Sequence, residues 1–464
     1  MRIVLADLRS SEGFVVKDTV AGGYGSRFRP FSRVTSVVCA IKQRLLAMPS
    51  VQLGYVAAIC AAAGHDVVWT DGAAVDGDVA IILTSLVDYR REAAWGRAQR
   101  DRGLRVGFIG LAASKLPELF DAHGDFVVLG EPEDAIGRLA RGEKLAGHVV
   151  SEAIGDLDAL PFPRWDLVGA RAKGLWSLPM YARPWGGAVP MLASRGCPEY
   201  CTYCPHRILA APRSRSTTNI CDELEYLARV RRRPYVVFRD PLFTNDRDRC
   251  LALCDEIRSR GLSIRFECET RLDRLDTGLL TALRGAGLAA VSFGVETVST
   301  DTLRRSGRRP IPEAHQRRVI AECGRLGIVT AGYYVFGFLQ DDWESIAATI
   351  EYAIDLGSTV AQFKVLTPYP GTPMWRQLAP HIFEHDWQRF DGYTPTFRHP
   401  HLSSEELVFL LGAAYTRFYM RPSYLANYLR MRRTRPSLLA RLDERVSARH
   451  GRLERAAMSR PVAC

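Results

Sequence analysis

Three cysteines lie within eight residues of the chain, in the stretch CPEYCTYC. The spacing Cys197-x3-Cys201-x2-Cys204 puts three thiolates on one loop, directly after a predicted strand at 189–196. Such an arc can bind three irons of a four-iron, four-sulfur ([4Fe-4S]) cluster. The fourth iron then has no protein ligand and stays open, as the vacant position does at a catalytic metal site. The alternatives are three buried cysteines, or a zinc site that would take His206 as its fourth ligand.

The elements that must position this loop alternate between strands and helices. Strands are predicted at 189–196, 235–240, 263–269, 289–296, 329–337 and 361–370, and helices at 219–232, 247–260, 276–286, 312–326 and 343–356. About six strand–helix units indicate a partial (β/α)6 TIM-type barrel over 189–385. Chemistry in such barrels takes place at the carboxyl ends of the strands, which is where the cysteine loop begins.

The first 145 residues predict a second α/β unit, an open, doubly wound, Rossmann-like sheet. Apolar strands are expected near 1–7, 65–71, 78–85, 104–110 and 125–134, with helices between them. The long connection after the first strand contains Gly22–Gly25, which is either an ordinary flexible loop or one that folds over a ligand. Prolines and tryptophans at 146–188 indicate a linker, and 386–464 is expected to be a helical, Arg-rich segment.

Composition and charge exclude several classes of protein. The 464 residues are 47% hydrophobic and 24% charged, which is typical of folded domains. Eleven cysteines are too few for a disulfide scaffold in so long a chain. We see no signal peptide and no apolar run of about 18 residues, so we expect a cytoplasmic protein.

The positive charge is concentrated at the end of the chain. Residues 421–464 hold eleven arginines against three acidic residues, and they supply +8 of the formal net charge of +11. We interpret this tail as a solvated helical face, with peripheral contact to an anionic membrane as the alternative. A nucleic-acid partner is not expected, because the ordered cysteine loop argues for an enzyme.

The cysteine motif, with Tyr203 before its third cysteine, resembles that of the radical S-adenosylmethionine (SAM) superfamily. Three further segments support the resemblance: FGVETVSTDTLRRSGR (293–308), in which Arg308 stands where lysine is usual, GYYVFGF (332–338) and VLTPYPGTPMW (365–375). The resemblance implies that SAM binds the open iron through its amino and carboxylate groups. It also implies that an electron from an external donor, such as flavodoxin or ferredoxin, cleaves SAM to a 5′-deoxyadenosyl radical.

The same resemblance implies a set of SAM contacts around the cluster. Asp240 is the candidate for the SAM amino group, Arg271 for its carboxylate and Glu296 for its ribose hydroxyls, with Tyr203 beside the cluster. A structural ion-pair network at the barrel mouth is the alternative for each of these charged residues. Arg195 either tunes the cluster or stabilises the loop.

The N-terminal unit resembles the cobalamin-binding domain that accompanies one large subgroup of this superfamily. The resemblance rests on QLGYVAAICAAAGHDVVWTDG (52–72) and VVLGEPEDAI (127–136). The chain lacks the D-x-H-x-x-G motif whose histidine ligates cobalt, and we interpret His65 as structural. Ligands of such sheets bind at strand carboxyl ends, and the predicted cobalamin contacts there are Thr84, Ser85, Gly107, Gly110, Gly130 and Glu131.

The leading hypothesis is therefore a cobalamin-dependent radical SAM methyltransferase. It would methylate an unactivated carbon, or phosphorus, of a small-molecule or natural-product substrate through the deoxyadenosyl radical and methylcobalamin. A cobalamin-dependent cyclase or ring-rearranging enzyme is the alternative among enzymes. A non-enzymatic cobalamin-sensing or nucleic-acid-binding protein is the alternative of another class.

Overall fold

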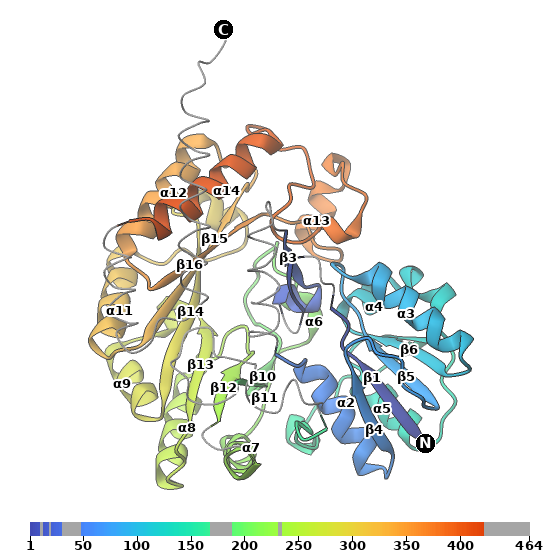
Figure 1. Ribbon diagram of the computed structural model, residues 1–464. Helices are drawn as coiled ribbons and strands as arrows, with labels where there is room; N and C mark the ends of the chain where they lie inside the picture. The colour runs from blue at the N-terminus through green and yellow to red at the C-terminus, as the bar shows by residue number, and fades with distance from the viewer. Residues whose placement is uncertain (10–12, 18–19, 30–47, 168–187, 231–233, 422–464) are drawn as a thin grey trace.

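The computed structural model describes residues 1–9, 13–17, 20–29, 48–167, 188–230 and 234–421. Within these ranges the chain forms two six-stranded parallel sheets, and helices cover them (Figure 1). The predicted α/β class, a Rossmann-like unit followed by a barrel-type sheet, is confirmed. The two sheets lie side by side in Figure 1, and β3 (Ser26–Phe28) and α6 (His206–Leu209) lie between them.

The N-terminal sheet has the strand order β4-β1-β5-β6-β7-β8, with every neighbouring pair parallel. Its strands are β1 (Arg2–Ala6), β4 (Asp66–Thr70), β5 (Val79–Leu83), β6 (Arg105–Ile109), β7 (Phe126–Leu129) and β8 (Gly147–Val150). All five residues of β5 are buried, as expected of a parallel strand that is covered on both faces. The strand order reverses between β1 and β5, which is the crevice where sheets of this kind bind ligands.

Four helices cover the two faces of this sheet: α2 (Val51–Ala62), α3 (Tyr89–Asp101), α4 (Leu111–Lys115) and α5 (Glu133–Ala140). Successive residues of β5 divide between two cores, since Ile81 packs with α2 and α5 while Ile82 packs with α3 and α4. β8 lies inside the stretch predicted as a linker. It is short, and only its third residue is buried, so it has no periodic pattern by which the sequence could reveal it.

The second sheet has the order β16-β15-β14-β13-β12-β9, again with all neighbours parallel. Its strands are β9 (Ala188–Met191), β12 (Tyr235–Phe238), β13 (Arg265–Thr270), β14 (Leu288–Glu296), β15 (Val329–Phe336) and β16 (Val360–Val365). Within the described residues β9 and β16 pair on one side only, so the sheet is an open, partial barrel.

Helices cover the outer side of this second sheet: α7 (Thr217–Val230), α8 (Arg247–Ser259), α9 (Thr277–Gly285), α11 (Glu313–Arg325), α12 (Trp343–Leu356) and α14 (Ser404–Tyr419). Two short helices, α10 (Thr300–Arg305) and α13 (Pro373–Leu378), follow β14 and β16 in the chain. Successive side chains of β13 point to opposite faces of the sheet. Phe266 and Cys268 point outward into the core under the helices. Glu267 and Glu269 point the other way and remain partly exposed. The concave face of the barrel sheet is therefore polar.

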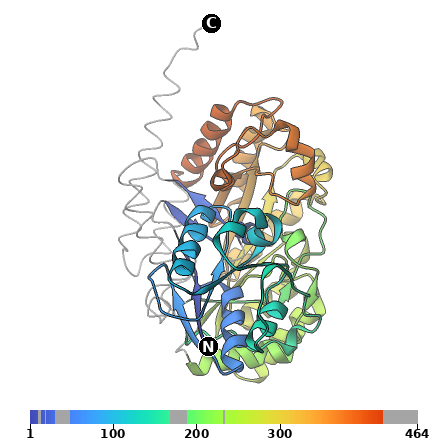
Figure 2. The ribbon, with the colours of Figure 1, turned by 90° about the vertical axis from the view of Figure 1, so that its right-hand side faces the viewer.

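A hairpin that the sequence suggested only as a long connection joins the two units. Its strands are β2 (Phe14–Val16) and β3, which pair antiparallel. Tyr24 between them is fully buried, stacks on Tyr369 with 5.4 Å between ring centroids, and donates a hydrogen bond from its hydroxyl to the Pro370 carbonyl. The hairpin thus anchors the N-terminal unit to the end of the barrel, and Figure 2 shows that unit in front of the barrel in the turned view.

Trp165, from the predicted linker, is also part of the junction between the two units. It is only 1% exposed and packs so closely on α2 that a Cβ at Gly54 would lie 2.8 Å from its ring. Trp176 and Trp185, and the Arg-rich tail from 422 onward, lie outside the described residues. Within the described ranges, no helix has both the length and the apolar character that crossing a bilayer requires.

Candidate active site between the two sheets

The cysteine loop begins after β10 (Ser194–Arg195) and ends at α6. The Thr202 amide donates a hydrogen bond to the Ser306 carbonyl (2.8 Å), and the Thr202 carbonyl accepts one from the Met374 amide (3.0 Å). Gly307 has φ +71° and lies so close to the loop that a Cβ there would be 2.4 Å from the Tyr200 carbonyl oxygen. The two segments that fix the loop are the 293–308 and 365–375 motifs of the sequence.

The three cysteines are free thiols that differ in burial, since Cys201 is buried while Cys197 and Cys204 are partly exposed. Burial raises the pKa of the Cys197 and Cys204 thiols. The Arg308 guanidinium lies beside Cys201, where its Nη1 donates a hydrogen bond to Sγ at 3.8 Å. Three thiolates suit a cluster, whose ligands spread over several irons, better than a single structural zinc, which takes four protein ligands.

Glu296, at the end of β14, has the backbone conformation that glycine normally adopts. Its φ is +68°, which makes it the single non-glycine residue with positive φ in the described chain. Such a conformation costs on the order of 1–3 kcal/mol and tends to persist at functional sites. The Glu296 carboxylate lies 3.5 Å from the Arg308 guanidinium, and burial raises the pKa of Glu296. The fold therefore holds a carboxyl group and a guanidinium group together beside Cys201.

Gly294 explains the G-x-E pattern physically. A Cβ at this position would lie 2.1 Å from Oε1 of Glu296 and 2.9 Å from Nη2 of Arg308. The Gly294 carbonyl also accepts a hydrogen bond from Arg308 Nη2. Only glycine leaves room for the pair, so Gly294 belongs to the site although it brings no side chain.

The remaining predicted SAM residues occupy different settings. The Tyr203 ring meets Phe338 edge-on at 5.3 Å. Asp240 is fully buried and accepts hydrogen bonds from the Ala193 amide (3.0 Å) and the Ser194 hydroxyl. Asp240 thus fixes the connection from β9 to the cysteine loop, and its contact with the SAM amino group stays a prediction.

Arg271 keeps one donor available. Its other guanidinium atoms donate to Asp273 (2.9 and 3.0 Å) and to the Arg309 carbonyl (2.9 Å). Nη1 is buried without a hydrogen-bond partner and lies 3.7 Å from Glu199. A buried, unsatisfied cationic donor suits an anionic ligand group, as predicted for the SAM carboxylate.

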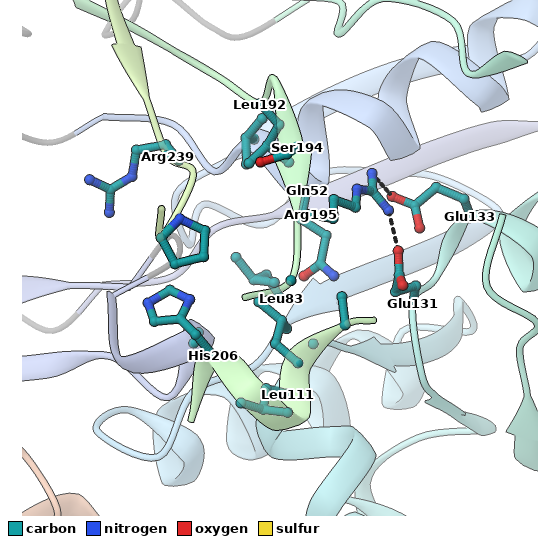
Figure 3. A pocket seen from close by; sticks show the side chains of 18 of the residues that line it. Gln52, Leu83, Leu111, Glu131, Glu133, Leu192, Ser194, Arg195, His206 and Arg239 are labelled. Atoms are coloured by element: carbon teal, nitrogen blue, oxygen red, sulfur yellow. Dashed lines mark hydrogen bonds and ion pairs between the residues drawn. The ribbon is translucent and has the colours of Figure 1, made fainter. Parts of the chain in front are cut away.

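A pocket lies between the two sheets (Figure 3). The N-terminal unit lines it with residues that include Gln52, Leu83 and Leu111, and the barrel unit lines it with Leu192, His206 and Arg239. Gly22, Gly23, Gly110 and Gly196 also line it, so backbone rather than side chain faces much of the space. Burial, reinforced by Arg239, lowers the pKa of His206 to about 4, so this imidazole is neutral at pH 7.

The structure brings some of the predicted cobalamin contacts to this pocket and leaves others away from it. Thr84, Gly110 and Glu131 line it, and Gly130 lines a neighbouring hollow. Ser85 is fully buried and donates to Glu92. Gly107 lies inside β6, where a Cβ would be 2.0 Å from the Phe126 ring, so this glycine accommodates a neighbouring ring.

Sequence reasoning missed the ion-pair network that joins the two units. Arg195 donates to Glu131 (2.5 Å) and to Glu133 (2.7 Å), as Figure 3 shows, and its guanidinium lies over the Tyr55 ring at 5.1 Å. Arg213 donates to Glu131 as well. The partners are more than 60 residues apart in the chain, and the GEPED stretch was interpreted as a ligand contact. The alternative of loop stabilisation for Arg195 is the one that this geometry favours.

The comparison with family models matches residues 191–353 to the radical SAM superfamily. Residues 191–353 of this chain belong to the radical SAM superfamily. The matched range contains the cysteine loop, β12 to β15 and the Gly294–Glu296 segment, and membership implies a [4Fe-4S] cluster and SAM as cofactors. The chain is thus a radical SAM enzyme.

Relatives and solved structures extend this result along the chain. An uncharacterized methyltransferase of Pyrococcus horikoshii is 28% identical over 65% of this chain and 68% of its own length. The anaerobic magnesium-protoporphyrin IX monomethyl ester cyclase of Rubrivivax gelatinosus is 26% identical over 63% of this chain, which spans only 52% of that enzyme. The structure of the radical SAM methyltransferase TsrM from Kitasatospora setae, with cobalamin and a [4Fe-4S] cluster bound, aligns with a TM-score of 0.62 at 15% identity, over 98% of this chain and 99% of its own. That last likeness shows a shared fold.

Proposed function

We propose that the protein is a cobalamin-dependent radical SAM methyltransferase that acts on a small-molecule substrate. The single observation that carries the proposal is the pocket between the two sheets, which opens beside the cysteine loop and is lined by the strand ends of a doubly wound sheet. When bound, the cluster and SAM supply a deoxyadenosyl radical and cobalamin supplies a transferable methyl group. The names of the relatives are consistent with methyl transfer.

The barrel unit would bind the cluster and SAM through its own side chains. Cys197, Cys201 and Cys204 would hold the cluster. The buried Arg308–Glu296 pair and the unsatisfied Nη1 of Arg271 would bind polar groups of SAM. An ion pair in a buried setting holds its geometry firmly, so SAM would meet preorganised groups.

The pocket suits a broad, largely apolar ring with polar edges. Leu83, Leu111 and Leu192 offer apolar surface, and the glycine backbone at Gly22 and Gly110 allows close approach. The hollow lined by Gly130 shares Glu131, Leu209 and Ala210 with this pocket, so a ligand larger than one of them could extend into the other. Cobalamin, a macrocycle with a nucleotide tail, would need both hollows, and neutral His206 adds no charge to the space.

Cofactor loading provides the first test. Anaerobic reconstitution with iron, sulfide and cobalamin should give both iron–sulfur and corrin absorption bands in the full chain. Replacing all three motif cysteines with alanine should abolish the iron–sulfur bands and leave the corrin bands. Corrin bands that never appear, whatever the cobalamin concentration, would contradict the cobalamin part of the proposal.

Product analysis separates methyl transfer from the cyclase alternative, which the cyclase relative favours. With SAM, reductant and cobalamin, methyl transfer should add one methylene mass to the product and form S-adenosylhomocysteine and 5′-deoxyadenosine together. A cyclase should form 5′-deoxyadenosine without S-adenosylhomocysteine and without the added mass. The second pattern, in the presence of a converted substrate, would overturn the methyltransferase proposal.

A further inference from the structure

Two opposite charges on the concave face of the barrel sheet have no ion-pair or hydrogen-bond partner in the described chain. Lys364 lies in β16 and Glu269 in β13, each one residue before the end of its strand. Neither side chain makes a hydrogen bond or an ion pair with any described residue. Both remain partly exposed although they point to the inside of the barrel. The other acids of this face are engaged, since Glu296 lies against Arg308 and Glu267 accepts from the Tyr235 hydroxyl.

The surroundings of Lys364 hold its ammonium group in place without neutralising it. Its stem packs on Gly392, where a Cβ would lie 3.2 Å from Cδ, and its Nζ is 5.8 Å from the centre of the Tyr393 ring. Asp391 is the nearest acid in sequence, but this carboxylate accepts from the Tyr393 amide (2.8 Å) and the Thr394 amide (2.9 Å) and faces Arg29 at 3.6 Å. Burial lowers the pKa of Lys364 to about 8.

Glu269 is the acidic residue of this pair, and it lies on the same face of the sheet as Lys364. Burial raises its pKa to about 7, while Arg239 and Lys364 oppose that shift and Glu296 adds to it. The side chain therefore senses Lys364 electrostatically, yet the two do not form an ion pair. Uncompensated charges are costly inside a protein, so their persistence indicates a ligand that completes them.

The pair lies apart from the groups that would bind SAM. Glu296 terminates β14 and Arg308 follows α10, so both stand at or beyond the strand ends beside the cysteine loop. Lys364 and Glu269 lie before the ends of their strands, with β14 and β15 between them. The gap between the pair thus faces the interior of the barrel, below the SAM residues.

We propose that Lys364 and Glu269 bind the substrate, and that the substrate is a zwitterion of the amino-acid class. Lys364 binds its carboxylate and Glu269 binds its ammonium group. The inference deepens the proposed function, on which it rests in taking the barrel interior as the place of the substrate. It predicts that charge spacing, more than shape, selects the molecules that bind.

Calorimetry on the anaerobically reconstituted full chain tests the pairing. The probes are ω-amino acids from glycine to 8-aminooctanoate, which vary only the distance between the two charges. One chain length should bind best, and its methyl ester and its N-acetyl derivative should each bind at least tenfold more weakly. Lys364→Met and Glu269→Gln should cost tenfold or more, Lys364→Arg should retain binding within a few-fold, and Lys115→Met, at an exposed site, should have no effect.

Lysine labelling provides a readout that needs no turnover. The chain has only six lysines, so trinitrobenzenesulfonate labelling at pH 8 can be assigned by peptide mass. Lys364 should react and should be protected by the best probe, while exposed Lys115 and Lys144 should react equally with and without it. Lys17, buried in ion pairs with Glu92 and Asp88, should stay unlabelled until the chain unfolds.

Three results would overturn the inference. The first is a probe series in which no member binds, and the second is equal binding by the methyl ester. The third is protection of Lys364 by SAM alone, which would assign the pair to the SAM site. Loss of methyl transfer with probe protection intact would instead count against the proposed function and leave the zwitterion site standing.

Discussion

The ion-pair network between the two units gives the sharpest stability prediction. Replacing Arg195 with methionine keeps most of the side-chain volume and removes the cation. Glu131 keeps Arg213, but Glu133, whose side chain is 1% exposed, loses its only ion-pair partner among the described residues, and its Oε2 already lacks a hydrogen bond. Removing one member of a buried pair typically costs about 3–5 kcal/mol. Because one of the two acids remains paired, we expect a cost of about 3 kcal/mol.

Urea unfolding of the full chain measures this cost, and hydrogen exchange shows whether the loss is greatest at the junction between the sheets. The matched control is Arg305→Met, since Arg305 pairs with Asp301 on the surface and both side chains are more than 60% exposed. Exposed pairs contribute about 0.2–1 kcal/mol, so the control should barely change the free energy of unfolding.

A second substitution tests the cause. Glu133→Gln in the Arg195→Met background removes the stranded charge, so it should recover a large part of the lost stability, whereas Glu133→Gln alone should destabilise. The reasoning is refuted if Arg195→Met falls within about 1 kcal/mol of the Arg305→Met control, or if the added Glu133→Gln change makes the protein less stable still.

Three further predictions follow from single sites. Gly294→Ala should weaken SAM binding by calorimetry and cost about 1–3 kcal/mol in unfolding through overpacking, whereas Gly324→Ala, with open space around its Cβ, should not destabilise. Gly107→Ala should destabilise the N-terminal sheet against the Phe126 ring in urea unfolding; an unchanged midpoint together with weaker cobalamin binding would contradict the packing role. Burial raises the pKa of Asp341 to about 7 from an unfolded value of 3.8. Its stabilising contribution is therefore present below about pH 4 and is lost as pH rises through about 7. Asp341→Asn should flatten the pH dependence of the free energy of unfolding across that window. A pH profile identical to that of the parent protein would argue against this role.

The alternation of strands and helices could be predicted from the sequence because parallel sheets leave strong signals. The helix predicted at 343–356 coincides with α12, and the strand predicted at 289–296 differs from β14 by one residue. Both elements bury a regular apolar face, which local periodicity reports directly. The cysteine loop was equally accessible, because its ligands lie within eight residues of one another.

The parts that the sequence did not predict depend on contacts between distant residues. The Glu131–Arg195 pair joins residues 64 apart, and only the packed fold shows that Glu131 is engaged by arginines as well as facing the pocket. The sequence around Gly107 gives no sign that this glycine differs in role from Gly110. The Phe126 ring that packs against Gly107 comes from a later strand. Local patterns specify elements well, whereas the use of a side chain at a junction depends on its tertiary neighbours.

The contact between Tyr24 and Pro370 has a consequence for biosynthesis. The two residues are 346 positions apart, so at common ribosomal rates of about 5–20 residues per second roughly 20–70 seconds separate their synthesis. During that interval Tyr24 cannot contact Tyr369 or Pro370, so the hairpin cannot reach its final packing. The N-terminal hairpin can therefore pack in its final position only after the end of the barrel has been synthesised.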